Sequence, residues 1–90
     1  MSEKDAYIKK MEARIDRANA EIETYKAKSK EAGADAEIEY EKTLSDLRSK
    51  REAAEAKIDE LKSAGEGAFA DLKRNLEQIW DDFDVIPRRR

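Results

Sequence analysis

The fold of this chain is decided by residues 8–25, IKKMEARIDRANAEIETY. Apolar side chains recur in this stretch at alternating intervals of three and four residues, namely at Ile8, Met11, Ile15, Ala18, Ile22 and Tyr25. Residues at these intervals lie on one face of an α-helix, so they form a narrow apolar stripe. Such a stripe is typical of a helix that packs lengthwise against another helix, as in a coiled coil. The pattern predicts helix pairing, but it names no chemistry.

The composition of the chain favours an all-α protein with thin seams between helices. Of its 90 residues, 39% are apolar and 46% are charged, which is too little apolar surface for a deep globular core. Long windows of the chain contain no strong helix breaker, because Pro87 is the only proline and the glycines are Gly33, Gly65 and Gly67. We therefore expect helices that share thin seams.

A second apolar stripe follows the first, with a change of register near Gly33. Its members are Tyr40, Leu44, Leu47, Arg51, Ala54, Ile58 and Leu61. Three consecutive steps of four residues separate Ala32 from Leu44, and a straight left-handed seam cannot absorb them without unwinding. Gly33 lies at this shift, and Asp35 is a suitable N-cap for a new helix. We favour an antiparallel helical hairpin about Gly33 over one continuous long helix.

A hairpin about Gly33 makes specific pairs between its two helices. It brings Tyr25 beside Tyr40, and it places Arg51 opposite Ile15. The stem of Arg51 can pack in the seam while its guanidinium reaches outward to Glu55, one turn along.

The last apolar series is the hardest to place. It consists of Gly65, Phe69, Leu72, Leu76, Ile79 with Trp80, and Phe83. The step of eleven residues from Ile58 to Phe69 lets a continuous helix keep one apolar face, whereas Gly65 offers a break at the same place, so both remain open. In a two-helix hairpin nothing from the same chain lies beside this series. Its burial then requires a fold-back, a second subunit or another partner.

These patterns predict one coiled-coil domain over residues 1–84. We expect its helices over about 3–31, 35–63 and 66–84, the last of which is either separate or continuous with the second, and a frayed tail over about 85–90 because Pro87 disfavours helix at the residue before it.

The residue types exclude most enzyme chemistry. The chain has no histidine and no cysteine, so it lacks the usual general base, the thiol nucleophile and the common zinc ligands. Asp81, Asp82 and Asp84 lack the glycine and distal glutamate of a calcium loop, and we expect them to be solvated. We expect no catalytic residue, no cofactor and no metal site. Acids and bases are interspersed at a net charge of -3, which makes nucleic acid an unfavourable partner, and Arg88 to Arg90 complement a helix end.

One segment resembles a known group of proteins. Residues 60–73, ELKSAGEGAFADLK, are similar to the pattern E-L-K-x-A-G-x-x-A-W-x-x-L-K of small uncharacterised bacterial coiled-coil proteins. Phe69 stands where that pattern has tryptophan, and Gly33 interrupts a segment that is otherwise rich in alanine. The resemblance covers about residues 7–83. It implies helical packing around Gly65 and no established activity.

We expect a structural or protein-interaction protein that self-associates as a homo-oligomer. The first ten residues carry charges where a signal peptide needs an apolar run, so a cytoplasmic location is expected. There are two alternatives. The C-terminal helix binds a different protein, or it binds a lipid surface, as in apolipoprotein-like or granule-coating proteins. The acidic residues of this helix disfavour lipid. The expected interface residues are Ile8, Met11, Ile15, Ile22, Tyr25, Leu44, Leu47, Ile58, Leu61, Phe69, Leu72, Leu76, Ile79, Trp80 and Phe83.

Overall fold

The protein is a bundle of three helices. A computed structural model describes residues 2–88, and within them it has α1 over Glu3–Glu31, α2 over Ala34–Ser63 and α3 over Glu66–Asp84, with no strand. The all-α fold with an antiparallel hairpin about Gly33 is thereby confirmed. The bundle is elongated, with principal extents of 49, 20 and 17 Å.

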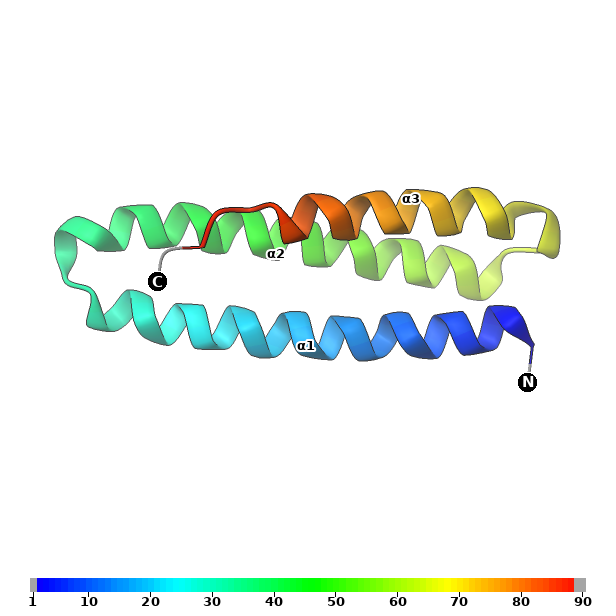
Figure 1. Cartoon of the computed structure of the whole chain (residues 1–90), viewed down its shortest axis with the longest axis horizontal. Helices are drawn as coiled ribbons and strands as arrows, with labels where there is room; N and C mark the ends of the chain where they lie inside the picture. Colours follow the sequence, from blue (N-terminus) through cyan, green and yellow to red (C-terminus); the bar gives the residue numbers. More distant parts are fainter. Residues whose placement is uncertain (1, 89–90) are drawn as a thin grey trace.

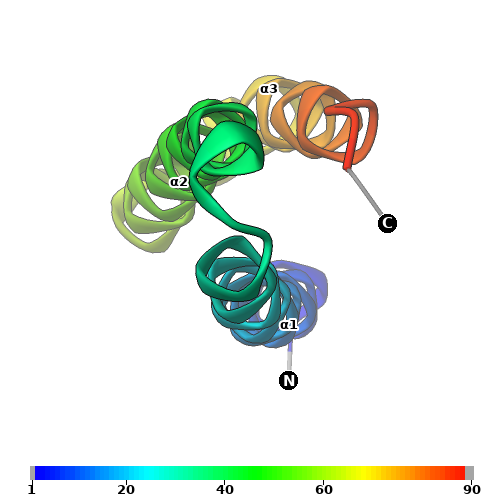
Figure 2. The same cartoon turned by 90° about the vertical axis from the view of Figure 1, so that its left-hand side faces the viewer.

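The helices lie side by side along the long axis of the molecule. Helix α2 returns antiparallel to α1, and α3 turns back along α2, so that α3 runs in the same direction as α1 (Figure 1). Seen end-on, the three helices occupy the corners of a triangle (Figure 2). The backbones of α1 and α3 approach each other less closely than the other two pairs do. Large side chains therefore have to fill the space between α1 and α3.

The turn between α1 and α2 depends on Gly33. Its φ of 86° lies in the left-handed region, where a side chain is strained. Gly33 is also the N-cap of α2, which begins at Ala34. Our assignment of the N-cap to Asp35 is wrong, since that residue lies in the first turn of the helix. The negative charge of its carboxylate interacts favourably with the positive N-terminal end of the helix dipole.

Helix α2 does not continue into α3. Ala64 and Gly65 both adopt extended backbone conformations, and together they reverse the chain. Of the three ways to bury the aromatic series that the sequence leaves open, the structure has the fold-back. Helix α3 is thus covered by α1 and α2 of its own chain.

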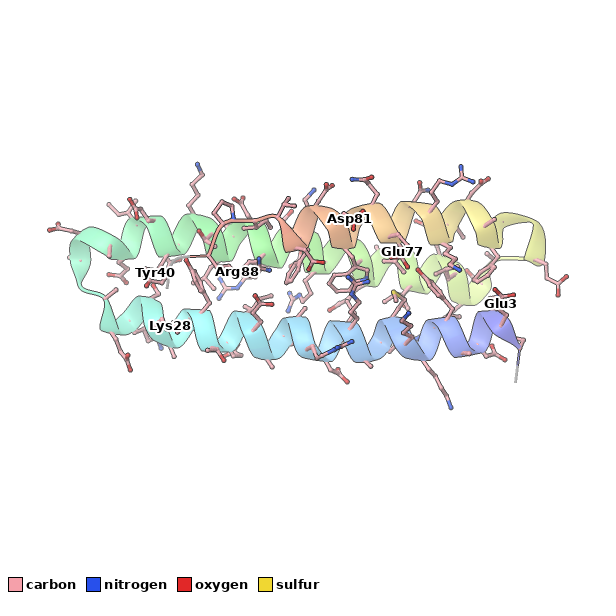
Figure 3. The ribbon with its side chains drawn as sticks, in the orientation of Figure 1. Glu3, Lys28, Tyr40, Glu77, Asp81 and Arg88 are labelled. Carbon is pink, nitrogen blue, oxygen red and sulfur yellow. The ribbon has the colours of Figure 1, made fainter. Side chains whose placement is uncertain are left out.

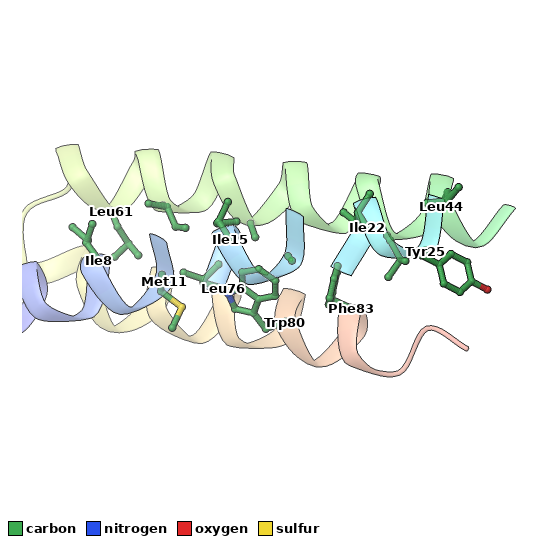
Figure 4. Close-up of a cluster of buried hydrophobic side chains, with 14 of the residues drawn as sticks. Ile8, Met11, Ile15, Ile22, Tyr25, Leu44, Leu61, Leu76, Trp80 and Phe83 are labelled. Carbon is green, nitrogen blue, oxygen red and sulfur yellow. The ribbon is translucent and has the colours of Figure 1, made fainter. Parts of the chain in front are cut away.

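A single apolar core runs along the three helices (Figure 4). All the residues that we expected at an interface are buried in this core except Phe69, Leu72 and Ile79, which pack partly buried at its edge. Met11, Leu47 and Leu61 have no exposed surface. Burying one large aliphatic side chain contributes about 1.5–3 kcal/mol. In the folded monomer these stripes hold the chain together, and a second copy can use them only if the bundle opens.

The Tyr25 and Tyr40 pair that we expected between α1 and α2 is present, and so is the expected contact of Arg51 with Glu55 within α2. The rings of Tyr25 and Tyr40 lie 4.8 Å apart between their centroids. Arg51 reaches outward as predicted, with its Nε 3.7 Å from Glu55 Oε1, and its Nη1 donates a hydrogen bond of 2.9 Å to Asn19 Oδ1. The register between α1 and α2 could therefore be read from the spacing of the stripes.

Candidate interaction site

The seam between α1 and α3 is the chemically distinctive part of the molecule. Tyr7, Arg14 and Glu21 occur at intervals of seven residues along α1, and each of them contacts α3 or the segment that follows it. Residues at this interval lie on one line along a helix. The line flanks the buried stripe of α1. Two of the residues that it contacts, Glu77 and Arg88, are labelled in Figure 3.

Tyr7 occupies the end of the seam where α3 begins. Its ring meets Phe69 edge to face, with centroids 5.8 Å apart, and the Lys73 ammonium lies 5.1 Å from the centroid of the Tyr7 ring. The Tyr7 hydroxyl donates a hydrogen bond of 2.7 Å to Glu77 Oε1. A ring contact, a cation–π contact and a charge-assisted hydrogen bond thus meet on one side chain.

Arg14 occupies the middle of the seam. Its guanidinium lies 4.9 Å from the centroid of the Trp80 ring, and its nitrogens lie 3.7 Å from Glu77 Oε2 and 3.4 Å from Asp84 Oδ2. Trp80 in turn meets Phe83 edge to face at 5.4 Å. The indole Nε1–H of Trp80 is buried without a hydrogen-bond partner among residues 2–88. Trp80 therefore contributes through its rings rather than through its polar group.

Arg88 closes the seam where α3 ends. Its guanidinium lies 5.0 Å from the centroid of the Phe83 ring and pairs with the Glu21 carboxylate. It also donates to three carbonyl oxygens near the end of α3, those of Phe83, Asp84 and Ile86. The Phe83 carbonyl also accepts a hydrogen bond from the Ile86 N–H, and a cation at this end of α3 is favoured by the helix dipole.

Residues 85–88 belong to the tail that we expected to fray, and one of them makes specific contacts. Arg88 is held against α1 and α3 by the contacts just described, whereas Val85 is exposed. The expected role of the arginines as a complement to a helix end holds for Arg88. Arg89 and Arg90 lie outside the described residues.

The seam between α1 and α3 combines aromatic side chains with arginine. Tyrosine, tryptophan, phenylalanine and arginine are among the residues enriched where separate proteins meet, and all four types line the contact between α1 and α3. The contact between α1 and α2 has an aliphatic core with the Tyr25 and Tyr40 pair, and polar pairs such as Arg51 with Asn19 and Lys62 with Glu12 lie beside it. The sequence indicated the aromatic residues of α3, but it missed the partners on α1 because charged residues beside a stripe normally face solvent.

The Tyr7 hydroxyl makes the stability of the seam depend on pH. Burial, together with the hydrogen bond to Glu77, raises the pKa of Tyr7 well above its ordinary value of about 10. In the unfolded chain this hydroxyl ionises near pH 10, whereas in the folded chain it keeps its proton. The folded state binds the proton more tightly, so the stabilisation is complete below about pH 10 and is lost as the pH rises above it.

Tyr7→Phe is therefore expected to remove part of the alkaline sensitivity. At neutral pH the variant loses about 1 kcal/mol, because the hydrogen bond to Glu77 is gone. Above about pH 10 the wild type loses stability and the variant does not, so the difference in their free energies of unfolding narrows by up to about 1.4 kcal/mol per pH unit. Urea denaturation followed by circular dichroism between neutral and alkaline pH measures both effects. If the free energies of unfolding of the variant and the wild type differ by the same amount at every pH, the alkaline loss of stability does not come from Tyr7.

Two further observations concern metal-binding groups and membrane-spanning helices. Among residues 2–88, no group of three or more histidine, cysteine, aspartate or glutamate side chains is placed to hold a metal ion. In the same part of the chain, no helix combines the length and the apolar character needed to cross a membrane.

Comparison with protein-family models, with curated proteins and with solved structures gives no match to this chain. The similarity of residues 60–73 to small bacterial coiled-coil proteins therefore stays a prediction.

Proposed function

We propose that this protein is a non-enzymatic structural or protein-interaction module that self-associates through its apolar seam and the segment from Phe69 to Phe83. The observation that supports the proposal is the composition of the seam between α1 and α3. A helix that serves only to fill a core needs aliphatic side chains, whereas this helix is joined to α1 by rings, arginines and carboxylates. We also propose a cytoplasmic location for this module.

Sedimentation equilibrium of the full chain tests self-association directly. The expected result is an average mass that rises above that of the monomer between micromolar and millimolar concentration. A mass that stays at the monomer value over the whole concentration range would contradict the proposal.

A lipid surface is the second candidate partner. Phe69, Leu72 and Ile79 are only partly buried at the edge of the core, so the apolar face of α3 is incompletely covered. Because Trp80 is already buried in the folded protein, a shift of its emission is a weak signal. Quenching of Trp80 by vesicles with brominated acyl chains is the sharper measurement. Quenching supports insertion of α3, and its absence with both neutral and anionic vesicles excludes this candidate.

A further inference from the structure

We propose that two copies of this chain associate by exchanging α3 about a hinge at Ala64–Gly65. In the exchanged dimer, α3 of each copy occupies the place between α1 and α2 of the other copy. This inference rests on the proposed self-association and names its mechanism. It also explains how the residues from Phe69 to Phe83 can serve as an interface although the monomer buries them.

The first argument comes from the register of the apolar residues across the hinge. Ile58 and Phe69 are eleven residues apart, which is almost three whole turns of an α-helix, so they share one face if the helix continues. In the closed monomer the helix does not continue, because α3 reverses direction at Ala64–Gly65, so this shared face contributes nothing to packing there. In an exchanged dimer α2 and α3 form one helix from Ala34 to Asp84 of about 75 Å, and its apolar face remains unbroken.

The second argument comes from the hinge itself. Gly65 is the N-cap of α3 and makes no side-chain hydrogen bond, so the first N–H groups of α3 lack a side-chain cap from this position. At the end of α2, the carbonyl oxygens of Lys62 and Ala64 accept hydrogen bonds from Lys4 Nζ, at 3.4 and 2.6 Å. A continuous helix pairs these N–H and carbonyl groups with each other and has no need of Lys4.

The third argument concerns the contacts that exchange preserves. The pairs of Tyr7 with Glu77, Arg14 with Trp80, and Glu21 with Arg88 all join α1 to α3 or to the segment after it. Each pair forms equally well when the two partners belong to different copies, as in any exchange of an identical element. A two-fold axis near Ala64–Gly65 places the two bundles end to end, so the particle is a rod of about 100 Å, twice the 49 Å of the monomer.

Two substitutions of Gly65 provide a matched test. The dihedral angles of Gly65, φ -76° and ψ 168°, and those of Ala64, φ -82° and ψ 147°, suit a proline at residue 65 and the residue before it. A Cβ at Gly65 meets no atom within 4 Å. Gly65→Pro therefore fits the closed monomer and forbids the continuous helix, whereas Gly65→Ala fits both forms and favours the continuous helix.

The two variants are expected to separate widely in sedimentation equilibrium. Alanine is favoured over glycine inside a helix by about fivefold, and the dimer contains two hinges, so Gly65→Ala is expected to lower the dissociation constant about 25-fold. Gly65→Pro is expected to raise it at least about a hundredfold. Equal association of the two variants overturns the exchange of α3. If Gly65→Ala is also monomeric at millimolar concentration, self-association itself fails.

Mixing two charge-reversed variants tests the same point without altering the hinge. Arg14→Glu places a carboxylate against Glu77 and Asp84, and the double variant Glu77→Arg with Asp84→Arg places cations against Arg14. Each variant alone has like charges across its seam. An exchanged dimer of one copy of each variant has two different seams. In one, the native Arg14 faces the native Glu77 and Asp84. In the other, the substituted residues face each other, and their charges are again opposite.

The mixture is expected to melt at a higher temperature than either variant alone and to sediment as a dimer. Small-angle scattering of this mixture is expected to show the longer rod. A closed monomer cannot combine the two substitutions in one seam. A mixture that behaves as the sum of its components therefore overturns the exchange, even where self-association of the wild type is observed.

Discussion

Replacing Trp80 by alanine is expected to destabilise the protein by about 3–5 kcal/mol, which is a large share of the about 5–15 kcal/mol that holds a typical domain folded. Trp80 is 1% exposed and has the largest fully buried side chain of the chain's described part. Its removal leaves a cavity between α1 and α3, and it takes away the ring beneath the Arg14 guanidinium and beside Phe83. Urea denaturation followed by circular dichroism measures the loss.

Two further variants make the Trp80 result specific. Trp80→Phe is expected to cost clearly less than Trp80→Ala, because phenylalanine keeps one ring under Arg14 and removes the indole N–H that has no partner among residues 2–88. Ile38→Ala is the surface control, since Ile38 is 77% exposed, and its effect is expected to stay within about 0.5 kcal/mol. A Trp80→Ala protein as stable as the Ile38→Ala protein would contradict the burial of α3.

Leu47→Ala is expected to cost about 2–5 kcal/mol. Leu47 lies in the middle of α2, belongs to the apolar core and has no exposed surface. Truncation at this site removes apolar contacts and leaves a cavity that the rigid helices fill only in part. Leu47→Met keeps most of the volume and is expected to cost less than about 1.5 kcal/mol. Thermal and urea unfolding of the two variants measure the contrast, and equal losses would contradict tight packing around Leu47.

The hairpin could be predicted from the sequence because a single physical rule governs it. Alternating steps of three and four residues place Tyr25 and Tyr40 on facing stripes, and the change of register at Gly33 marks the turn. The outward reach of Arg51 to Glu55 follows from the same alignment. These features depend on the spacing of the apolar residues and on one glycine that can adopt the left-handed conformation. Both the spacing and the glycine are visible in the sequence.

The direction of α3 could not be predicted, because the spacing fits two structures. The eleven-residue step from Ile58 to Phe69 suits a continuous helix, and the extended conformation of Gly65 is open to any residue type, so its identity alone does not require a break. The choice is made by long-range contacts such as those of Arg14 with Glu77 and Asp84. Surface charges on separate helices look alike in a sequence, and only the fold shows which of them meet.

In the monomer, the turn at Gly33 lies at one end of the bundle, and the Ala64–Gly65 junction lies at the other (Figure 1). The residues on either side of Gly33 are exposed, so a group can be attached beside Gly33 while the glycine keeps its left-handed conformation. A fluorescent label or a short epitope inserted there would therefore leave the packing of α3 undisturbed. Two labels of different colour at this position, on two copies, would report on the arrangement of those copies in living cells.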